Sequence, residues 1–126
     1  MPEGKSLRGS RILIAEDSAI QALDLKILLE DAGAEVVGPA SSAKEAVALA
    51  GTASLTCAIL DVVLRCEPVF RAAEVLNSNG IKIIFHTGSS DVQALRRDWP
   101  EAQIITKPAP ADLLLQAVRT ACCPDR

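Results

Sequence analysis

The sequence predicts an α/β fold in which five parallel strands form one doubly wound sheet with helices on both faces. Five short apolar runs have the continuous hydrophobic character of strands that are buried on both sides. These runs are residues 11–15, 35–38, 57–60, 81–85 and 103–106. After each run, apolar residues recur at helical spacing. Strands that alternate with helices in this way indicate a parallel sheet joined by right-handed crossovers.

The first strand, residues 11–15, ends at Glu16 and Asp17. In the helix that follows, either Asp17 or Ser18 can cap the start and Gly33 can close the end. Polar residues Gln21, Asp24 and Glu30 fall on other faces than the apolar positions, which predicts an amphipathic helix. The apolar positions that recur at helical spacing, with Leu28 beside them, are Ile20, Leu23 and Ile27.

The second strand, residues 35–38, is short and is expected to stop at Pro39. The segment from Ser42 to Glu45 fits a capping box, so the second helix begins there. Its buried face is predicted to hold Ala46, Val47 and Ala50. Strand three, residues 57–61, consists of an apolar run that ends at Asp61. The third helix is predicted from Val69, Ala72, Ala73 and Leu76, and it ends at Asn79 and Gly80.

Strand four, residues 81–85, ends near His86 and Thr87. Ser90 is expected to cap a short fourth helix that is broken before Pro100. Strand five, residues 103–106, leads into Lys107 and Pro108. Pro110 suits the first turn of the fifth helix. The apolar face of that helix is predicted to hold Leu113, Leu114, Ala117 and Val118.

Size and composition limit what the protein can be. The 126 residues fit one domain, which we expect at residues 11–121 between flexible tails at 1–10 and 122–126. A net charge of −3 and only three aromatic residues argue against nucleic-acid binding. No apolar stretch is long enough to cross a bilayer, and the first residues lack the apolar core of a signal peptide. We therefore expect a cytoplasmic protein that binds no membrane.

The four cysteines suggest no shared site. Cys57 lies in a predicted strand, Cys66 in a loop, and Cys122 and Cys123 at the end of the chain. They form neither a disulfide framework nor a paired Cys-x-x-Cys metal site. We interpret them as buried or incidental thiols, which agrees with a cytoplasmic location.

Polar side chains collect where the predicted strands end. Strand one presents Glu16 and Asp17, strand three Asp61, strand four Thr87 and strand five Lys107. The carboxyl ends of parallel strands lie at one edge of the sheet, which is where ligands of open α/β sheets bind. Three carboxylates that meet there repel one another unless a cation neutralises them, and Mg²⁺ suits oxygen ligands. An aspartate in such a site can be a nucleophile toward phosphorus, with metal and ammonium neutralising the phosphoryl charge.

These residues resemble the motifs of the response-regulator receiver family over nearly the whole chain. The matching pieces are residues 14–17, residues 59–61, the pair Thr87-Gly88 and the pair Lys107-Pro108, one at each expected strand end. The sequence Phe-His-Thr-Gly at 85–88 is more similar to the stand-alone receivers of alphaproteobacteria than to chemotaxis receivers. The resemblance implies a flavodoxin-like fold with strand order 2-1-3-4-5, and a chemotaxis receiver is itself a known example of that order.

The resemblance also implies roles for single residues. Asp61 corresponds to the phosphoacceptor, Thr87 to the switch hydroxyl and Lys107 to the lysine that pairs with the phosphoryl group. For Mg²⁺, the implied ligands are Asp17, Asp61 and the backbone carbonyl of Val63, with Glu16 acting through water. The implied partner is a histidine kinase or histidine phosphotransfer protein. Output would pass by protein contact from a monomer or weak homodimer that is not an enzyme in its own right.

Some positions depart from the family pattern. Arg65 and Cys66 stand where the loop after the phosphoacceptor commonly has Pro and Gly. Ile104 replaces the aromatic switch residue, so a signal that uses an aromatic rotamer is excluded there. Ala109 replaces a frequent Phe, and Glu16 replaces Asp, which the family tolerates.

Other interpretations remain open at this stage. Asp61 and Asp17 could simply cap the elements that follow them, and Lys107 could be a solvated loop lysine. The only histidine, His86, is expected to be a packing residue, and Trp99 to close the fourth helix. A degenerate receiver that binds without being phosphorylated is one competing function. A haloacid-dehalogenase-type phosphatase is another, although such sites need a second Asp where this chain has Val63.

Overall fold

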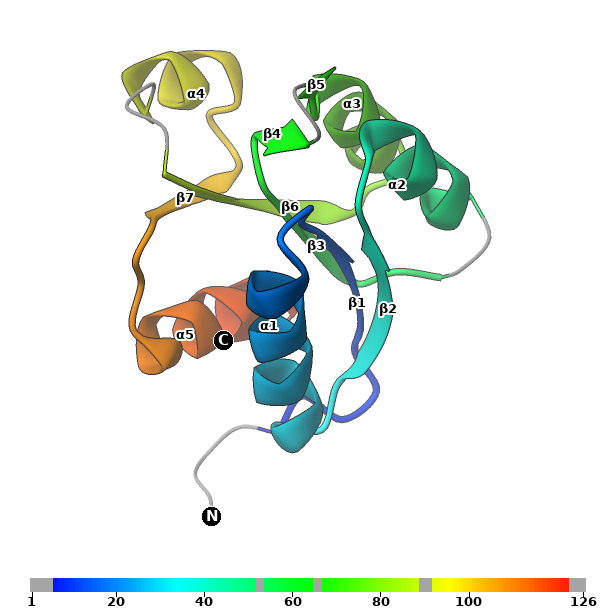
Figure 1. Cartoon of the computed structure of the whole chain (residues 1–126), viewed down its shortest axis with the longest axis vertical. Helices are drawn as coiled ribbons and strands as arrows, with labels where there is room; N and C mark the ends of the chain where they lie inside the picture. The colour runs from blue at the N-terminus through cyan, green and yellow to red at the C-terminus, as the bar shows by residue number, and fades with distance from the viewer. Residues whose placement is uncertain (1–5, 52–53, 65–66, 89–91, 123–126) are drawn as a thin grey trace.

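The computed structural model describes residues 6–51, 54–64, 67–88 and 92–122. Its centre is a five-stranded parallel sheet in the order β2-β1-β3-β6-β7, which confirms the predicted order 2-1-3-4-5 (Figure 1). The strands of this sheet are β1 (Arg11–Ala15), β2 (Glu35–Ala40), β3 (Cys57–Leu60), β6 (Lys82–Thr87) and β7 (Gln103–Thr106). The predicted doubly wound α/β class is therefore confirmed.

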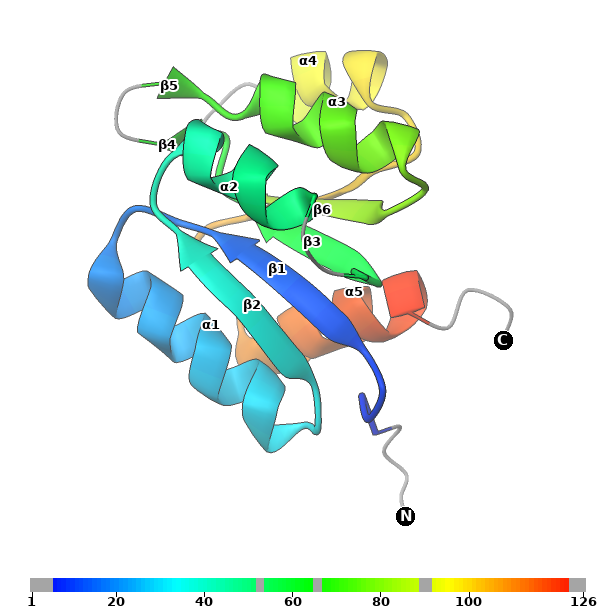
Figure 2. The ribbon, with the colours of Figure 1, turned by 90° about the vertical axis from the view of Figure 1, so that its right-hand side faces the viewer.

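Within the described residues, five helices cover the two faces of the sheet. They are α1 (Ala19–Asp31), α2 (Ala43–Ala50), α3 (Phe70–Ser78), α4 (Val92–Asp98) and α5 (Ala111–Cys122). Figure 2 shows α1 and α5 on one face, with α2, α3 and α4 on the other. No helix among the described residues is both long and apolar enough to span a membrane.

Each face of the sheet has its own apolar core, because successive strand residues point to opposite sides. Leu60 and Phe85 pack in the core under α2, α3 and α4. Their neighbours Ile59 and Ile84 pack in the core under α1 and α5. Trp99 closes the end of α4 against the first core, with its ring centroid 5.7 Å from that of Phe85. The packing role expected for Trp99 is confirmed.

Serine caps fix two of the helices where the sequence places them. The side chain of Ser18 accepts a hydrogen bond from the backbone N–H of Gln21 at the start of α1. Ser42 does the same for Glu45 at the start of α2, while the Glu45 carboxylate accepts from the backbone N–H of Ser41. Of the two caps proposed for α1, the structure uses Ser18, and Asp17 is left at the edge of the sheet.

Two strand boundaries differ from the prediction. Strand β2 continues through Pro39 to Ala40, because β2 is an edge strand and the missing N–H of proline costs no ladder bond there. Strand β6 begins at Lys82 rather than at residue 81, and it ends at Thr87, in agreement with the predicted end near His86 and Thr87. In addition, β4 (Val63–Leu64) and β5 (Glu67–Pro68) form a small antiparallel pair after β3 that periodicity did not indicate.

The apolar face predicted for α1 does not face the core. Ile20, Leu23 and Ile27 are 76%, 55% and 49% exposed. The side chains that α1 buries are those of Ala22, Leu25 and Leu29. Both sets have the spacing i, i+3, i+7, so helical periodicity alone could not choose between them. In α5, likewise, Leu113 is exposed while Leu114, Ala117 and Val118 are buried as predicted.

The chain ends also depart from the predicted tails. Leu7 is 1% exposed and packs in the core under α1 and α5, with its N–H bonded to the carbonyl of Ala32. At the other end, Cys122 is the last residue of α5. Predictions that concern Arg65, Cys66, Ser90 and Cys123 fall outside the described residues.

Candidate functional site

Strand register brings the predicted site residues to one edge of the sheet. Ala15 of β1 lies opposite Leu60 of β3, so the residues that follow them, Glu16 and Asp61, leave the sheet side by side. The backbone N–H of Asp61 donates to the carbonyl of Ala15 at 2.9 Å. The backbone itself therefore sets the spacing of the first two carboxylates.

The same edge positions Lys107. Thr87 of β6 lies opposite Thr106 of β7, and the backbone N–H of Lys107 donates to the carbonyl of Thr87 at 2.8 Å. The Thr87 side chain is buried at the end of β6. Thr87 and Lys107 are thus joined through their backbones, next to β3 and its Asp61.

Three carboxylates converge at this edge. Glu16, Asp17 and Asp61, here called the acid cluster, each offer one carboxylate oxygen, and these oxygens lie within 4.8 Å of one another. Glu16 is buried, Asp61 is partly buried and Asp17 is exposed. The cluster therefore opens to solvent on the side of Asp17 and Asp61, so an ion or a phosphoryl group could reach it from there.

Lys107 lies between two of these acids. Its Nζ is 3.0 Å from Oε1 of Glu16 and 3.1 Å from Oδ2 of Asp61. All three side chains are more than four-fifths buried, so water screens these contacts less than at an open surface. The other carboxylate oxygen of Glu16, Oε2, accepts a hydrogen bond from the backbone N–H of Ser18 at 3.1 Å. Glu16 is thereby fixed at both oxygens.

Burial and the neighbouring charges shift the pKa values of Glu16 and Lys107. Burial raises the pKa of Glu16, and the charge of Asp61 raises it further, while bonds to Lys107 and Ser18 lower it less than burial raises it. Burial alone would lower the pKa of Lys107, but hydrogen bonds to Glu16 and Asp61 raise it above its ordinary value. The ammonium is therefore held charged, and one acid of the cluster carries a cost for being ionised.

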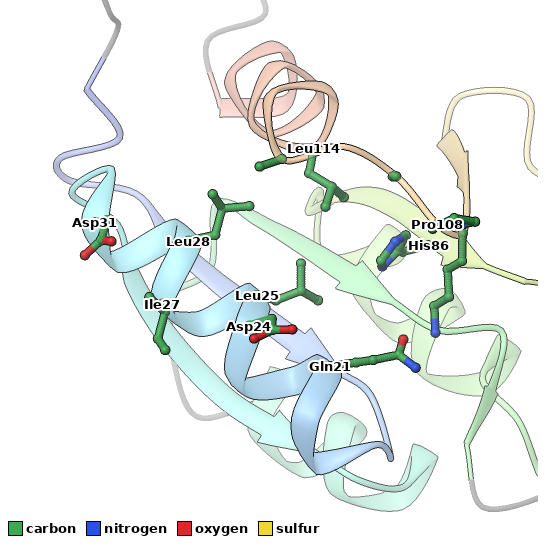
Figure 3. Close-up of a pocket in the computed structure, with 12 residues that line it drawn as sticks. Gln21, Asp24, Leu25, Ile27, Leu28, Asp31, His86, Pro108 and Leu114 are labelled. Atoms are coloured by element: carbon green, nitrogen blue, oxygen red, sulfur yellow. The ribbon is translucent and has the colours of Figure 1, made fainter.

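A groove runs from this site between α1 and α5. It has a volume of about 720 Å³, and its wall includes Lys107 and His86 from the strand ends. Figure 3 shows Leu25 of α1 and Leu114 of α5 directed into the groove, with His86 at the end near Pro108. We call it the α1–α5 groove. The predicted strand order places these two helices on one face of the sheet, but the groove between their side chains has no signature in the sequence.

His86 is a buried histidine at the end of that groove. Neither ring nitrogen has a hydrogen-bond partner among the described residues. Burial lowers its pKa, the charge of Lys107 lowers it further, and Asp61 opposes the change. The predicted packing role is consistent with this environment.

The predicted site residues are thus largely assembled. Glu16, Asp17, Asp61 and Lys107 are together, and Thr87 is bonded to Lys107 through its backbone. Val63 opens β4 two residues after Asp61, and its role as a metal ligand stays a prediction. Ile104, at the position of the missing aromatic residue, pairs with Phe85 of β6 and packs against the core.

Comparison with known proteins identifies the family. No family model matches the chain. The signal receiver domain of a modulated diguanylate cyclase from Desulfovibrio desulfuricans G20 is 30% identical, with a TM-score of 0.79 that covers 90% of this chain and 94% of that one. The chain belongs to the receiver-domain family of response regulators. The resemblance seen in the sequence is thereby confirmed.

Two further proteins are similar to this receiver domain. A response regulator receiver protein from Sinorhizobium medicae WSM419 has a TM-score of 0.81 at 27% identity, over 93% of this chain and 97% of that chain. The transcriptional regulatory protein PdtaR of Mycobacterium tuberculosis is 32% identical over 114 residues, which are 88% of this chain and 56% of PdtaR. The chain therefore spans about half the length of the curated relatives that it matches.

Proposed function

We propose that this receiver domain accepts a phosphoryl group on Asp61 from the phosphohistidine of a histidine kinase or histidine phosphotransfer protein. The observation that carries the proposal is the convergence of three carboxylates and Lys107 at one sheet edge. Within that cluster Asp61 is the partly exposed acid at the end of a central strand, so its free oxygen can attack phosphorus. The domain would act in the cytoplasm and catalyse at most its own phosphorylation and dephosphorylation.

The charge balance supports a divalent cation at the cluster. Three carboxylates and the one ammonium of Lys107 leave two net negative charges when all are ionised. Burial is the main cause of the raised pKa of Glu16, and the negative charge of Asp61 raises it further. Carboxylate oxygens are the ligands that Mg²⁺ prefers, so we propose that Asp17, Asp61 and the Val63 carbonyl hold Mg²⁺, with Glu16 acting through water. When bound, the ion would neutralise charge on the transferring phosphoryl group.

Lys107 and Thr87 would hold the product. Lys107 already contacts Asp61, so its ammonium can follow the negative charge onto the phosphoryl oxygens. The Thr87 hydroxyl would donate to another of these oxygens. The backbone hydrogen bond from Lys107 to Thr87 would couple the movements of these two residues when the phosphoryl group is bound. A shift there would pass to the face made by α4, β7 and α5, where output by protein contact is expected.

We propose that the phosphodonor approaches along α1. This helix begins two residues after Asp17, and its exposed apolar residues Ile20, Leu23 and Ile27, here called the α1 stripe, lie on its surface. The α1–α5 groove beside them reaches Lys107. A partner that brings a phosphohistidine to Asp61 would cover the first turns of α1, so we propose an amphipathic helix of that partner as the occupant of this surface.

Phosphorylation by a small donor tests the proposal without a partner protein. The domain is incubated with Mg²⁺ and acetyl phosphate, and its intact mass is recorded by mass spectrometry. We expect one added phosphoryl group that is lost in base. It should be absent from Asp61→Asn and absent when EDTA replaces Mg²⁺. The control Asp112→Asn changes an exposed carboxylate on α5 and should be phosphorylated normally.

The alternatives give different outcomes in the same assay. Mg²⁺ binding without any adduct would identify a binding module that is not phosphorylated. Steady release of phosphate from phosphate esters would favour a phosphatase. An adduct that persists in Asp61→Asn would contradict the assignment of the acceptor.

A further inference from the structure

Two cysteines that are far apart in the sequence meet at the edge of the sheet opposite the acid cluster. Cys57 is the first residue of β3 and Cys122 is the last residue of α5. Their Sγ atoms are 3.9 Å apart, and both thiols are free. A disulfide needs the two sulfurs at about 2.05 Å, so a shift of about 2 Å would close the bond. Cys122 lies in the last described turn of α5, and helix ends fray more readily than helix interiors.

The two thiols differ in exposure and in reactivity. Cys57 is fully buried in the core under α1 and α5, whereas Cys122 is half-buried. The hydrogen bond between the two thiols and a hydrogen bond with the Ser10 side chain lower the pKa of Cys122 to about 6, although burial opposes this change. The same hydrogen bond raises the pKa of Cys57, and burial raises it further. Cys122 is therefore the accessible thiol with more thiolate character, and Cys57 is the protected thiol beside it.

We propose that Cys57 and Cys122 form an oxidation site, at which a hydroperoxide converts the two thiols into an intramolecular disulfide. Cys122 loses its proton to solvent, and its sulfur attacks the distal oxygen of the hydroperoxide. An S–O bond forms and the O–O bond breaks, and the alkoxide that leaves takes up a proton. The sulfur of Cys57 then loses its proton and attacks the Cys122 sulfenic acid, and the departing hydroxide becomes water. Two thiols and one hydroperoxide thus give one disulfide, one alcohol and one water.

The disulfide would fasten the end of α5 to the start of β3. Asp61 lies four residues beyond Cys57, about 13 Å along the strand, so the bond would form well away from the acid cluster. It would close a loop of 66 residues, from Cys57 to Cys122. By restricting the unfolded chain, such a loop should raise the melting temperature by about 10 °C. The helix held in this way is the one that follows Lys107, so oxidation would limit the movement of α5.

Peptide mapping after oxidation tests the proposal. The full chain is treated with hydrogen peroxide, remaining thiols are blocked, and trypsin is used to release peptides 45–65 and 120–126. Peptide 45–65 contains Cys57 alone, and peptide 120–126 contains Cys122 and Cys123. We expect the two peptides to be linked, with a mass two hydrogens below their sum. The link should be lost in Cys122→Ser and kept in Cys123→Ser, and circular dichroism checks that each variant is folded.

Other products would overturn the proposal. These are a bond within peptide 120–126, a link that Cys123→Ser abolishes, or sulfinic acid on Cys122 with no cross-link. Linked peptides without a rise in melting temperature would overturn the proposed fastening of α5. Because the readout involves neither Mg²⁺ nor phosphate, its result is independent of the proposed phosphorylation of Asp61.

Discussion

Glu16 is the residue at which stability and function oppose each other. It is 4% exposed, beside Asp61, and burial raises its pKa above the ordinary 4.5. A carboxyl group with a raised folded-state pKa favours folding while it is protonated, and this contribution is lost as pH rises through the folded pKa. The ionised Glu16 would thus contribute to metal binding and not to the stability of the fold.

Replacing Glu16 should therefore change stability in a pH-dependent way. As pH rises above 4.5, we expect the metal-free Glu16→Gln variant to gain unfolding free energy relative to the wild type, measured by urea denaturation. Its affinity for Mg²⁺ should fall by about 10- to 100-fold, because Glu16 orients the ligands around the ion. Glu101→Gln, which changes an exposed acid, should leave both quantities unchanged. A stability difference that does not vary with pH would contradict this account of Glu16.

His86 offers a direct test of the electrostatic environment at the site. It is the only histidine in the chain, so its titration can be followed without overlap from another imidazole. Burial and the charge of Lys107 lower the pKa of His86 below the ordinary 6.5. The neutral imidazole therefore favours the folded state above pH 6.5, and this contribution to the free energy of unfolding is lost as the pH falls through the pKa of the folded protein. Proton NMR should show its imidazole titrating below 6.5. In Lys107→Met the titration should move toward higher pH, whereas the exposed Lys82→Met should not change it. A wild-type pKa above 6.5 would show that the ring is not held in this environment.

At the scale of single residues, the sequence predicted which side chains form the acid cluster and which lysine contacts it. Glu16, Asp61 and Lys107 each follow a strand directly and Asp17 comes one residue later, and strand ends are recognisable from where an apolar run stops. The contact between Cys57 and Cys122 could not be predicted, because it depends on where the last turn of α5 lies over β3. Side-chain pairs of this kind require the packed structure.

Helix α1 shows the limit of sequence reasoning at the scale of an element. Its start was predictable from Ser18, but its buried face was not, because apolar residues occur on several of its faces. The face with Ala22, Leu25 and Leu29 packs on the sheet, and Ile20 and Leu23 remain exposed. A helix that leaves such residues in solvent has a surface suited to a partner.

The α1 stripe should therefore matter for phosphotransfer and not for folding. Leu23→Ser should lower the rate of phosphotransfer from the partner kinase by about tenfold or more, as expected for an interface anchor. Acetyl phosphate should still phosphorylate the variant, and its unfolding free energy should stay within about 0.5 kcal/mol of the wild type. By contrast, Leu29→Ala should cost about 2–5 kcal/mol, because Leu29 is fully buried.

Leu113→Ser provides a matched control, since Leu113 is an exposed leucine on α5 that does not line the α1–α5 groove. Its phosphotransfer rate should equal that of the wild type. Equal losses in Leu23→Ser and Leu113→Ser would argue against docking along α1.

At the scale of the whole molecule, the sheet order is what assembles the site. Glu16 and Asp17 follow β1 and Asp61 follows β3, and these strands are neighbours at the centre of the sheet. Lys107 follows the edge strand β7, yet its side chain reaches Glu16 across the sheet, 91 residues away in the sequence. Alternating strands and helices predicted this fold class. The small β4–β5 pair was not predicted, because segments of two residues carry no periodicity.

The central claim is that the acid cluster holds a divalent ion beside the acceptor Asp61. A crystal structure of the domain grown with Mg²⁺ tests it most directly. We expect one octahedral ion at about 2.1 Å from carboxylate oxygens of Asp17 and Asp61 and from the carbonyl of Val63, with Glu16 linked through water. An acid cluster that stays without an ion at saturating Mg²⁺, or an ion bound to other residues, would contradict the account.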